Sequence, residues 1–360
     1  MPGTYISWPF CAQKCTYCNF ASGVFPHELE ERYLDRLLAE LRATRWPWTP
    51  ETVYLGGGTP ASMEPAQLAA VLAKVPGRPW REATLEAAPG AITREQVRAW
   101  RAAGINRVSL GVQSFVDAEL RRTGRKHNAA GVAADMAVLR SEGLREINID
   151  LIAGLPMQTG ETWTQSLRWI EELAPPHVSV YMLEVDEDSR LGQELLLGGV
   201  RYGAMDVPNE DRIADFYELA VERLAQFGLR RYEISNFAQP GSESLHNLKY
   251  WRLEPYLGFG ADAHSFDGRV RWQNVETPQA YCDATDPRAE FVEANLSEER
   301  FFVGLRLLDG ISPSGQERAP HEAAIAELIA DGLLQQEGGT LRLTKRGVLL
   351  SNEVFERFLL

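Results

Sequence analysis

Cysteine is scarce in this chain, which has only four among its 360 residues. Three of them, Cys11, Cys15 and Cys18, fall within eight positions, and Cys282 stands far from them. A disulfide framework needs cysteines spread over the chain, whereas so tight a group favours a metal site in a reducing compartment. We therefore expect a cytoplasmic metalloprotein.

Long apolar runs and an excess of basic charge are also missing. No window approaches the roughly 20 apolar residues of a membrane span. The opening residues MPGTYISWPFC lack the basic and apolar regions of a signal peptide. The 37 Lys and Arg residues face 50 Asp and Glu residues, a formal net charge of −13. Because nucleic-acid binding needs a basic surface, we expect no nucleic-acid partner, and an RNA-modifying enzyme is disfavoured.

Six short apolar runs alternate with longer amphipathic stretches in the first half of the chain. The runs cover residues 4–8, 52–55, 83–88, 107–112, 146–152 and 178–183. Short buried runs separated by helical patterns are typical of parallel strands joined by right-handed crossovers. The pattern predicts an α/β fold, a partial (β/α)6 TIM-like barrel whose core covers residues 1–185.

The chain changes character after this core. Residues 186–296 are rich in Gly, Pro, aromatic and acidic residues, and we interpret them as an extension of the barrel that carries functional loops. Residues 297–360 combine helical patterns with a hairpin signal at Gly338 and Gly339. They predict a small C-terminal winged-helix-like α+β domain.

The strongest motif is C-x-x-x-C-x-x-C, in the segment FCAQKCTYCNF. Three thiolates so close together can bind three irons of one [4Fe–4S] cluster, a type of cluster that usually takes four cysteines. The fourth iron is then open and can chelate the amino and carboxylate groups of S-adenosylmethionine (SAM). Structural zinc is the alternative, but it needs four ligands and no further cysteine is near. Tyr17, beside Cys18, can stack on an adenine ring or shield the cluster.

Further residues predict a pocket for SAM next to this cluster. The sequence GGGTP at residues 56–60 follows the second apolar run, and its glycines allow a backbone to approach a ligand closely. Four polar residues lie near the ends of successive predicted strands, namely Glu86, Gln113, Arg125 and Asp150. Barrels of this kind bind ligands at those ends, where a carboxylate can hold ribose hydroxyls and an arginine can hold a carboxylate. Capping or loop roles are the alternative for each residue.

The segment HNLKYW at residues 246–251 is a third candidate. A histidine beside Tyr250 and Trp251 can ligate haem iron while the aromatic rings flank the macrocycle. A buried, hydrogen-bonded histidine is the alternative and the commoner case. The cations that are close in sequence, and therefore candidates for the haem propionates, are Arg230, Arg231, Lys249 and Arg252.

Together these motifs resemble the HemW family of haem chaperones, relatives of the HemN oxygen-independent coproporphyrinogen III dehydrogenases. The likeness covers nearly the whole chain and includes YISWPFCAQKCTYCNF, GINRVSLGVQSF, GRKHN, INIDLIAGLP and HNLKYW. The resemblance implies a [4Fe–4S] cluster on the three clustered cysteines, and haem with His246 as its ligand. The SAM site that it implies consists of Tyr5, Gly57, Gly58, Thr59, Glu86, Gln113, Arg125 and Asp150.

Two positions bear on the choice between the two branches. HemN-type enzymes usually have one more cysteine where Phe20 stands here, and a histidine is common where Ser7 stands. The resemblance therefore implies a protein that binds haem and delivers it to acceptor haemoproteins, and it leaves open whether those acceptors lie at a membrane. The alternative is an oxygen-independent coproporphyrinogen III dehydrogenase that uses a 5′-deoxyadenosyl radical.

Overall fold

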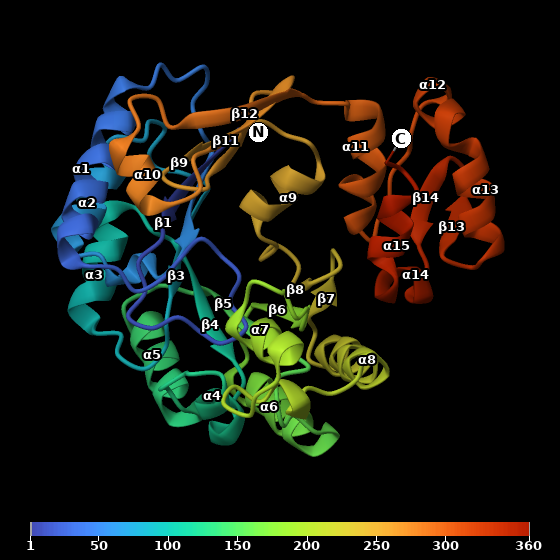
Figure 1. Cartoon of the computed structure of the whole chain (residues 1–360), viewed down its shortest axis with the longest axis horizontal. Coiled ribbons are helices and arrows are strands. Elements are labelled where there is room, and N and C mark those ends of the chain that lie inside the picture. The colour runs from blue at the N-terminus through green and yellow to red at the C-terminus, as the bar shows by residue number, and fades with distance from the viewer. Residues whose placement is uncertain (1, 360) are drawn as a thin grey trace.

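The computed structural model describes residues 2–359, and a curved 12-stranded sheet is its main sheet (Figure 1). Six strands lie side by side in chain order at its centre, and each is parallel to the next. They are β1 (Gly3–Trp8), β2 (Thr52–Gly57), β3 (Glu82–Ala87), β4 (Arg107–Gln113), β5 (Glu146–Ala153) and β6 (His177–Met182). The predicted α/β fold with a partial parallel barrel is thus confirmed.

The crossover helices cover the outer side of this sheet (Figure 1). They are α1 (His27–Ala43), α2 (Pro65–Leu72), α3 (Arg94–Ala103), α4 (Asp117–Arg122), α5 (Ala129–Ser141) and α6 (Gly160–Leu173). Helix α3 shows why they form where they do: Thr93 caps its start through the backbone N–H of Gln96, and Gly104 ends it at φ 106°. Its buried face, Val97 and Trp100, packs onto the sheet.

Residues after β6 extend the sheet at both edges. On one side β8 (Asn236–Ala238) pairs with β6, and β7 (Arg230–Arg231) pairs with β8. On the other side β9 (Tyr256–Phe259) runs parallel to β1, followed outward by β10 (His264–Phe266), β11 (Val270–Asn274) and β12 (Arg288–Glu293). The helices of this part are α7 (Arg190–Leu197), α8 (Glu210–Gln226), α9 (Leu245–Trp251) and α10 (Pro278–Asp283).

The last part of the chain forms a small domain beside the barrel (Figure 1). Its elements are α11 (Leu296–Phe302), α12 (Gly315–Arg318), α13 (Glu322–Ala330), β13 (Leu334–Glu337), β14 (Thr340–Leu343), α14 (Lys345–Leu349) and α15 (Ser351–Glu356). Strands β13 and β14 form the predicted hairpin, and Gly338 takes a φ of 59° in its turn. The α+β character of this domain is confirmed, while the boundaries 185/186 and 296/297 stay predictions.

A continuous apolar core lies between the sheet and its helices and includes Ile6, Leu55, Leu85, Val108 and Ile149, all fully buried. Within residues 2–359, no helix combines the length and the apolar character needed to cross a membrane.

Candidate functional site

The three clustered cysteines lie in a loop that leaves the carboxyl end of β1. Two backbone hydrogen bonds close the base of this loop, from Cys11 N to Gly23 O (2.8 Å) and from Gly23 N to Pro9 O (2.9 Å). A turn at its tip brings Cys18 N to 3.4 Å from Cys15 O. All three thiols are free and half-buried. Burial raises the pKa of the Cys11 thiol, while hydrogen bonds from Thr59 and Ser22 act in the opposite direction.

The GGGTP segment packs directly against the base of the cysteine loop. Gly58 N donates to Trp8 O (2.8 Å), and Thr59 N donates to Phe10 O (2.9 Å). A Cβ atom on Gly58 would lie 2.7 Å from Phe10 O, so only glycine allows this approach. The segment therefore holds the cysteine loop in place.

The donor set fits an iron–sulfur cube with one open corner. Among the described residues, no three His, Cys, Asp or Glu side chains are arranged to hold one metal ion. A cube does not need such convergence, because each thiolate binds a different iron. Cys282 is on α10, which packs against α1, and it does not join the cysteine loop.

Two carboxylates face the interior of the barrel near this loop. Glu86 accepts a hydrogen bond from the Tyr54 hydroxyl (2.8 Å), and burial raises its pKa to about 7. Asp150 accepts from Ser109 Oγ (3.0 Å) and Asn148 Nδ2 (2.7 Å). Burial also raises the pKa of Asp150, although these hydrogen bonds oppose the shift. Both carboxyl groups are thus oriented before any ligand arrives.

Gln113, Arg125 and Tyr17 meet at the same end of the barrel. Arg125 donates one nitrogen to Gly111 O (2.7 Å) and another to the Tyr17 hydroxyl (3.2 Å). Gln113 has a φ of 69°, and its buried Oε1 has no hydrogen-bond partner among the described residues. The same is true of Arg125 Nε. Buried polar atoms without partners are costly, so these two side chains are suited to a polar ligand.

Tyr5 and Tyr54 line the barrel below these groups, with ring centroids 6.1 Å apart. Sequence reasoning predicted Tyr5 but missed Tyr54, which orients Glu86. It also missed Ser109 and Asn148, which hold Asp150. Each of these three residues lies on a strand that carries a predicted ligand residue or is next to one, and this position is the sequence signal that could have found them. The predicted SAM residues gather at one end of the sheet, and their contacts with SAM stay predictions.

His246 lies at the opposite end of the barrel from the cysteines. Its Nδ1 is 2.8 Å from Thr52 Oγ1, and its Nε2 is 2.8 Å from the Tyr250 hydroxyl oxygen. Thr52 is the first residue of β2 and Gly57 the last, so about 16 Å of strand separates His246 from the glycine segment. His246 is 1% exposed, and burial lowers its pKa to about 3. In this conformation neither ring nitrogen is free to bind iron.

The neighbours of His246 fix α9 across the amino ends of the strands. The carboxylate of Glu82, at the start of β3, accepts from Ser244 Oγ (3.2 Å), Leu245 N (2.8 Å) and His246 N (2.9 Å). The two N–H groups are unpaired backbone donors of a helix start, and a carboxylate there also interacts favourably with the helix dipole. Residues 186–296, interpreted from their composition as an extension that carries functional loops, thus contain a docked helix at Leu245–Trp251.

Two residues predicted to serve haem have other surroundings. Lys249 is 1% exposed and lies 3.6 Å from Glu254, so it is not a surface cation for a propionate. Trp251 lies under the guanidinium of Arg306, which is 4.5 Å from its ring centroid. Since Arg306 belongs to the C-terminal part of the chain, α9 connects the base of the barrel to the small domain.

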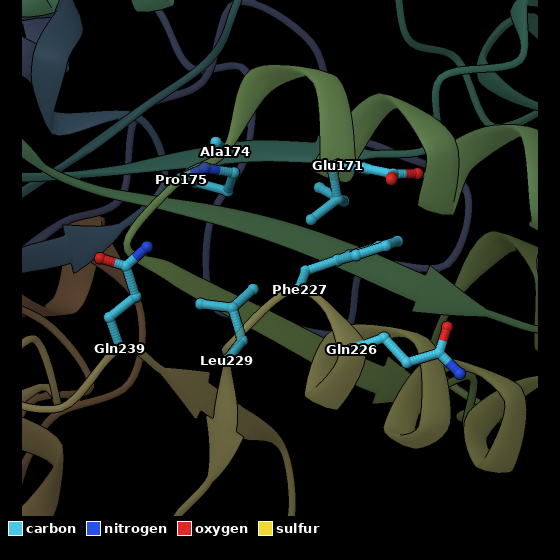
Figure 2. A pocket seen from close by; sticks show the side chains of 8 residues that line it. Glu171, Ala174, Pro175, Gln226, Phe227, Leu229 and Gln239 are labelled. Carbon is cyan, nitrogen blue, oxygen red and sulfur yellow. The ribbon is translucent and has the colours of Figure 1, made fainter.

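One surface depression lies away from all of these groups. It measures about 300 Å3 and is lined by Ile170, Glu171, Ala174, Pro175, Gln226, Phe227, Leu229 and Gln239. Figure 2 shows apolar side chains and two amides between the ends of α6 and α8. Glu171 is its only titratable group, and we assign it no catalytic role.

Comparison with protein families gives two matches. Residues 5–170 match the model of the radical SAM superfamily, and residues 293–350 match the HemN C-terminal domain. The first match contains the cysteine loop, the glycine segment and the four polar candidates. The second covers most of the small domain.

Individual relatives match over almost their whole length. The chain is 33% identical to the haem chaperone HemW of Lactococcus lactis and 33% identical to that of Escherichia coli. Each alignment covers 99% of this chain and 97% of the relative. Among solved structures, the coproporphyrinogen III oxidase HemN of E. coli has the same fold, with a TM-score of 0.84 over 99% of this chain and 90% of that one, at 23% identity.

Proposed function

Because this chain belongs to the radical SAM superfamily and, within it, to the HemW family, we propose that it binds haem and delivers it to acceptor haemoproteins. The observation that carries the proposal is the match to haem chaperones over almost the full length of both partners. Membership of the superfamily implies a [4Fe–4S] cluster and SAM. The closed cysteine loop and the oriented carboxyl groups fit both.

Cys11, Cys15 and Cys18 would hold the cluster, which when bound supplies an open iron for SAM and a source of one electron. The glycine segment would lie along the methionine end of SAM, because it packs against the base of the cysteine loop and Gly56 lies against the carboxylate of Glu86. Glu86 and Asp150 would accept hydrogen bonds from the ribose hydroxyls. The unpartnered atoms of Gln113 and Arg125 would take up the remaining polar groups of SAM.

His246 as the haem ligand requires α9 to leave the base of the barrel. The ring would have to give up Thr52 and Tyr250, and Glu82 would lose three donors at the same time. Among the predicted propionate partners, Arg230 and Arg252 are exposed, which suits that role. His246 therefore stays a predicted ligand for an open state of α9.

The alternative, coproporphyrinogen III dehydrogenation, has less support. Its structural relative is 23% identical, which shows the fold alone. Phe20, which replaces the further cysteine of those enzymes, is 66% exposed and makes no part of the barrel interior. Ser7, which replaces a common histidine, is buried beside Gly57.

Two assays on the anaerobically reconstituted chain test the proposal. Ferric haem should bind and shift its absorption spectrum, and coproporphyrinogen III should not be converted to protoporphyrinogen IX with SAM and reductant present. Cys11→Ala, Cys15→Ala and Cys18→Ala should each abolish the roughly four irons per chain that a [4Fe–4S] cluster contains. The matched control Cys282→Ala should retain them. Sustained turnover by the wild type, or no haem binding, would contradict the proposal.

A further inference from the structure

A row of large apolar side chains faces solvent beside the cysteine loop. We call this surface the apolar ledge, and its exposed fractions lie between 49% and 83%. It consists of Met157, Leu195, Leu196, Leu197, Val200 and Met205. Single exposed apolar residues are ordinary, but six on neighbouring segments are typical of an interaction site.

The backbone beneath the ledge is held by buried polar contacts. The carboxylate of Glu194, on α7, accepts from the backbone N–H groups of Tyr202 (2.6 Å), Gly203 (2.7 Å) and Ala204 (3.1 Å). These bonds fold the following segment back against α7. Since Glu194 is 8% exposed, they are well shielded from water. The ledge residues are therefore exposed on an ordered support.

Arg122 and Asp206 connect the backbone segments that carry Val200, Met205 and Met157. One guanidinium nitrogen of Arg122 donates to Val200 O (3.2 Å) and to Asp206 Oδ2 (3.0 Å). Met157 N donates to Asp206 O (2.8 Å), which places Met157 beside the segment that carries Met205. The two exposed methionines thus lie on segments that are tied to each other and to the segment that follows the leucines.

The ledge is also tied to the cysteine loop. Leu191 N, at the start of α7, donates to the carbonyl of Thr16, between Cys15 and Tyr17 (2.9 Å). Arg190 reaches Lys14 O (3.4 Å) on the same loop. The ledge therefore lies at the end of the barrel that carries the cluster and SAM residues, opposite to His246.

We infer that the apolar ledge is where haem docks, an inference that rests on the proposed function. A porphyrin presents a flat apolar face, which leucine side chains can cover, and an iron atom that accepts a methionine thioether as axial ligand. Its propionates are anionic and need cations. Arg201, next to Val200 in the chain, is exposed, and its guanidinium lies over the ring of Tyr202 (5.3 Å from the centroid). A lipid surface or a second copy would not use the thioethers.

The test is a titration of ferric haem into the reconstituted full chain, with absorption spectra and tryptophan fluorescence recorded together. The variants are Leu196→Ser/Leu197→Ser and Met205→Ala, and both should fold because these side chains face solvent. The control is Val292→Ser on β12, an equally exposed valine elsewhere on the molecule. The leucine variant should bind on the order of tenfold more weakly than the control. Met205→Ala should alter the spectrum of bound ferric haem.

Each outcome has a separate meaning. If the wild type binds no haem, both the proposed function and the ledge fail. If the wild type and both ledge variants bind haem as the control does, the ledge is refuted and the proposed function stands. If binding is lost only in His246→Ala, haem docks at α9 and the ledge is again refuted. If the ledge variants change only the sedimentation coefficient, the surface serves self-association and the inference is overturned.

Discussion

Replacing His246 by alanine distinguishes a structural role of this residue from an iron-binding one. The imidazole makes two hydrogen bonds of 2.8 Å, and its ring centroid lies 5.3 Å from that of Tyr54. His246→Ala removes both bonds, leaves the buried Thr52 hydroxyl without its partner, and opens a cavity. With about 1 kcal/mol for each bond and a similar amount each for the stranded group and the cavity, we expect a loss of roughly 3–4 kcal/mol in unfolding free energy.

This loss would be a large share of a typical domain stability of about 5–15 kcal/mol, so it is easily measured. Urea denaturation followed by circular dichroism, without haem, gives the value. His27→Ala is the matched control, since His27 is exposed and makes only surface ion pairs of 3.6–3.7 Å; it should change stability by less than about 0.5 kcal/mol. If His246→Ala and His27→Ala unfold at the same urea concentration, the reasoning from the hydrogen bonds is wrong.

His246→Ala also tests whether His246 takes part in haem binding. Well below its urea transition, folded His246→Ala should bind haem with unchanged affinity if α9 stays docked. Loss of haem binding by the folded variant would instead show that α9 opens and that His246 reaches the iron.

Three further predictions concern pH, packing and SAM. Burial lowers the pKa of His246 to about 3, against about 6.5 in the unfolded chain, so below pH 6.5 the unfolded state binds more protons. The free energy of unfolding should therefore fall as the pH decreases towards 3, by up to about 1.4 kcal/mol per pH unit. Urea midpoints measured across this range should fall less steeply in His246→Gln than in the wild type. Gly58→Ala should lower the free energy of unfolding by about 1–3 kcal/mol, because its Cβ would meet Phe10 O at 2.7 Å. It should also lower the iron content after reconstitution. An unchanged iron content would show that the glycine segment and the cysteine loop separate freely. Glu86→Ala and Asp150→Ala should each weaken SAM binding by roughly ten- to a hundredfold, measured by calorimetry, while the cluster stays intact. If both variants bind SAM with the affinity of the wild type, these carboxylates only support the fold.

Much of the central fold could be predicted from the sequence because its elements are regular. The six parallel strands have six to eight residues each and are buried on both faces, so they stand out as apolar runs. The edge strands could not be recognised in this way. Strands β7 to β10 have only two to four residues, too few for a periodic pattern, and their pairing depends on partners far away in the chain.

The candidate site also contains parts that the local sequence predicts and parts that it does not. The cysteine loop and the glycine segment follow from local sequence, since their spacing alone predicts their chemistry. The surroundings of His246 do not, because Thr52, Glu82 and Tyr54 come from two other strands. Composition suggested functional loops within residues 186–296, and the run Leu195–Leu197 did not reveal that its side chains face solvent. Burial is decided by tertiary packing, which a single sequence does not display.

The place of β1 inside the sheet has a consequence for the order of synthesis. This strand is the first along the chain, yet one of its two edges pairs with β9, at residues 256–259. Gly3 N also bonds to Pro255 O (3.0 Å). Until those residues leave the ribosome, one edge of β1 has unpaired backbone groups and the cysteine loop beyond it lacks its final support. Contacts so far apart in sequence close slowly, so cluster assembly is expected to follow, rather than accompany, the emergence of the cysteines.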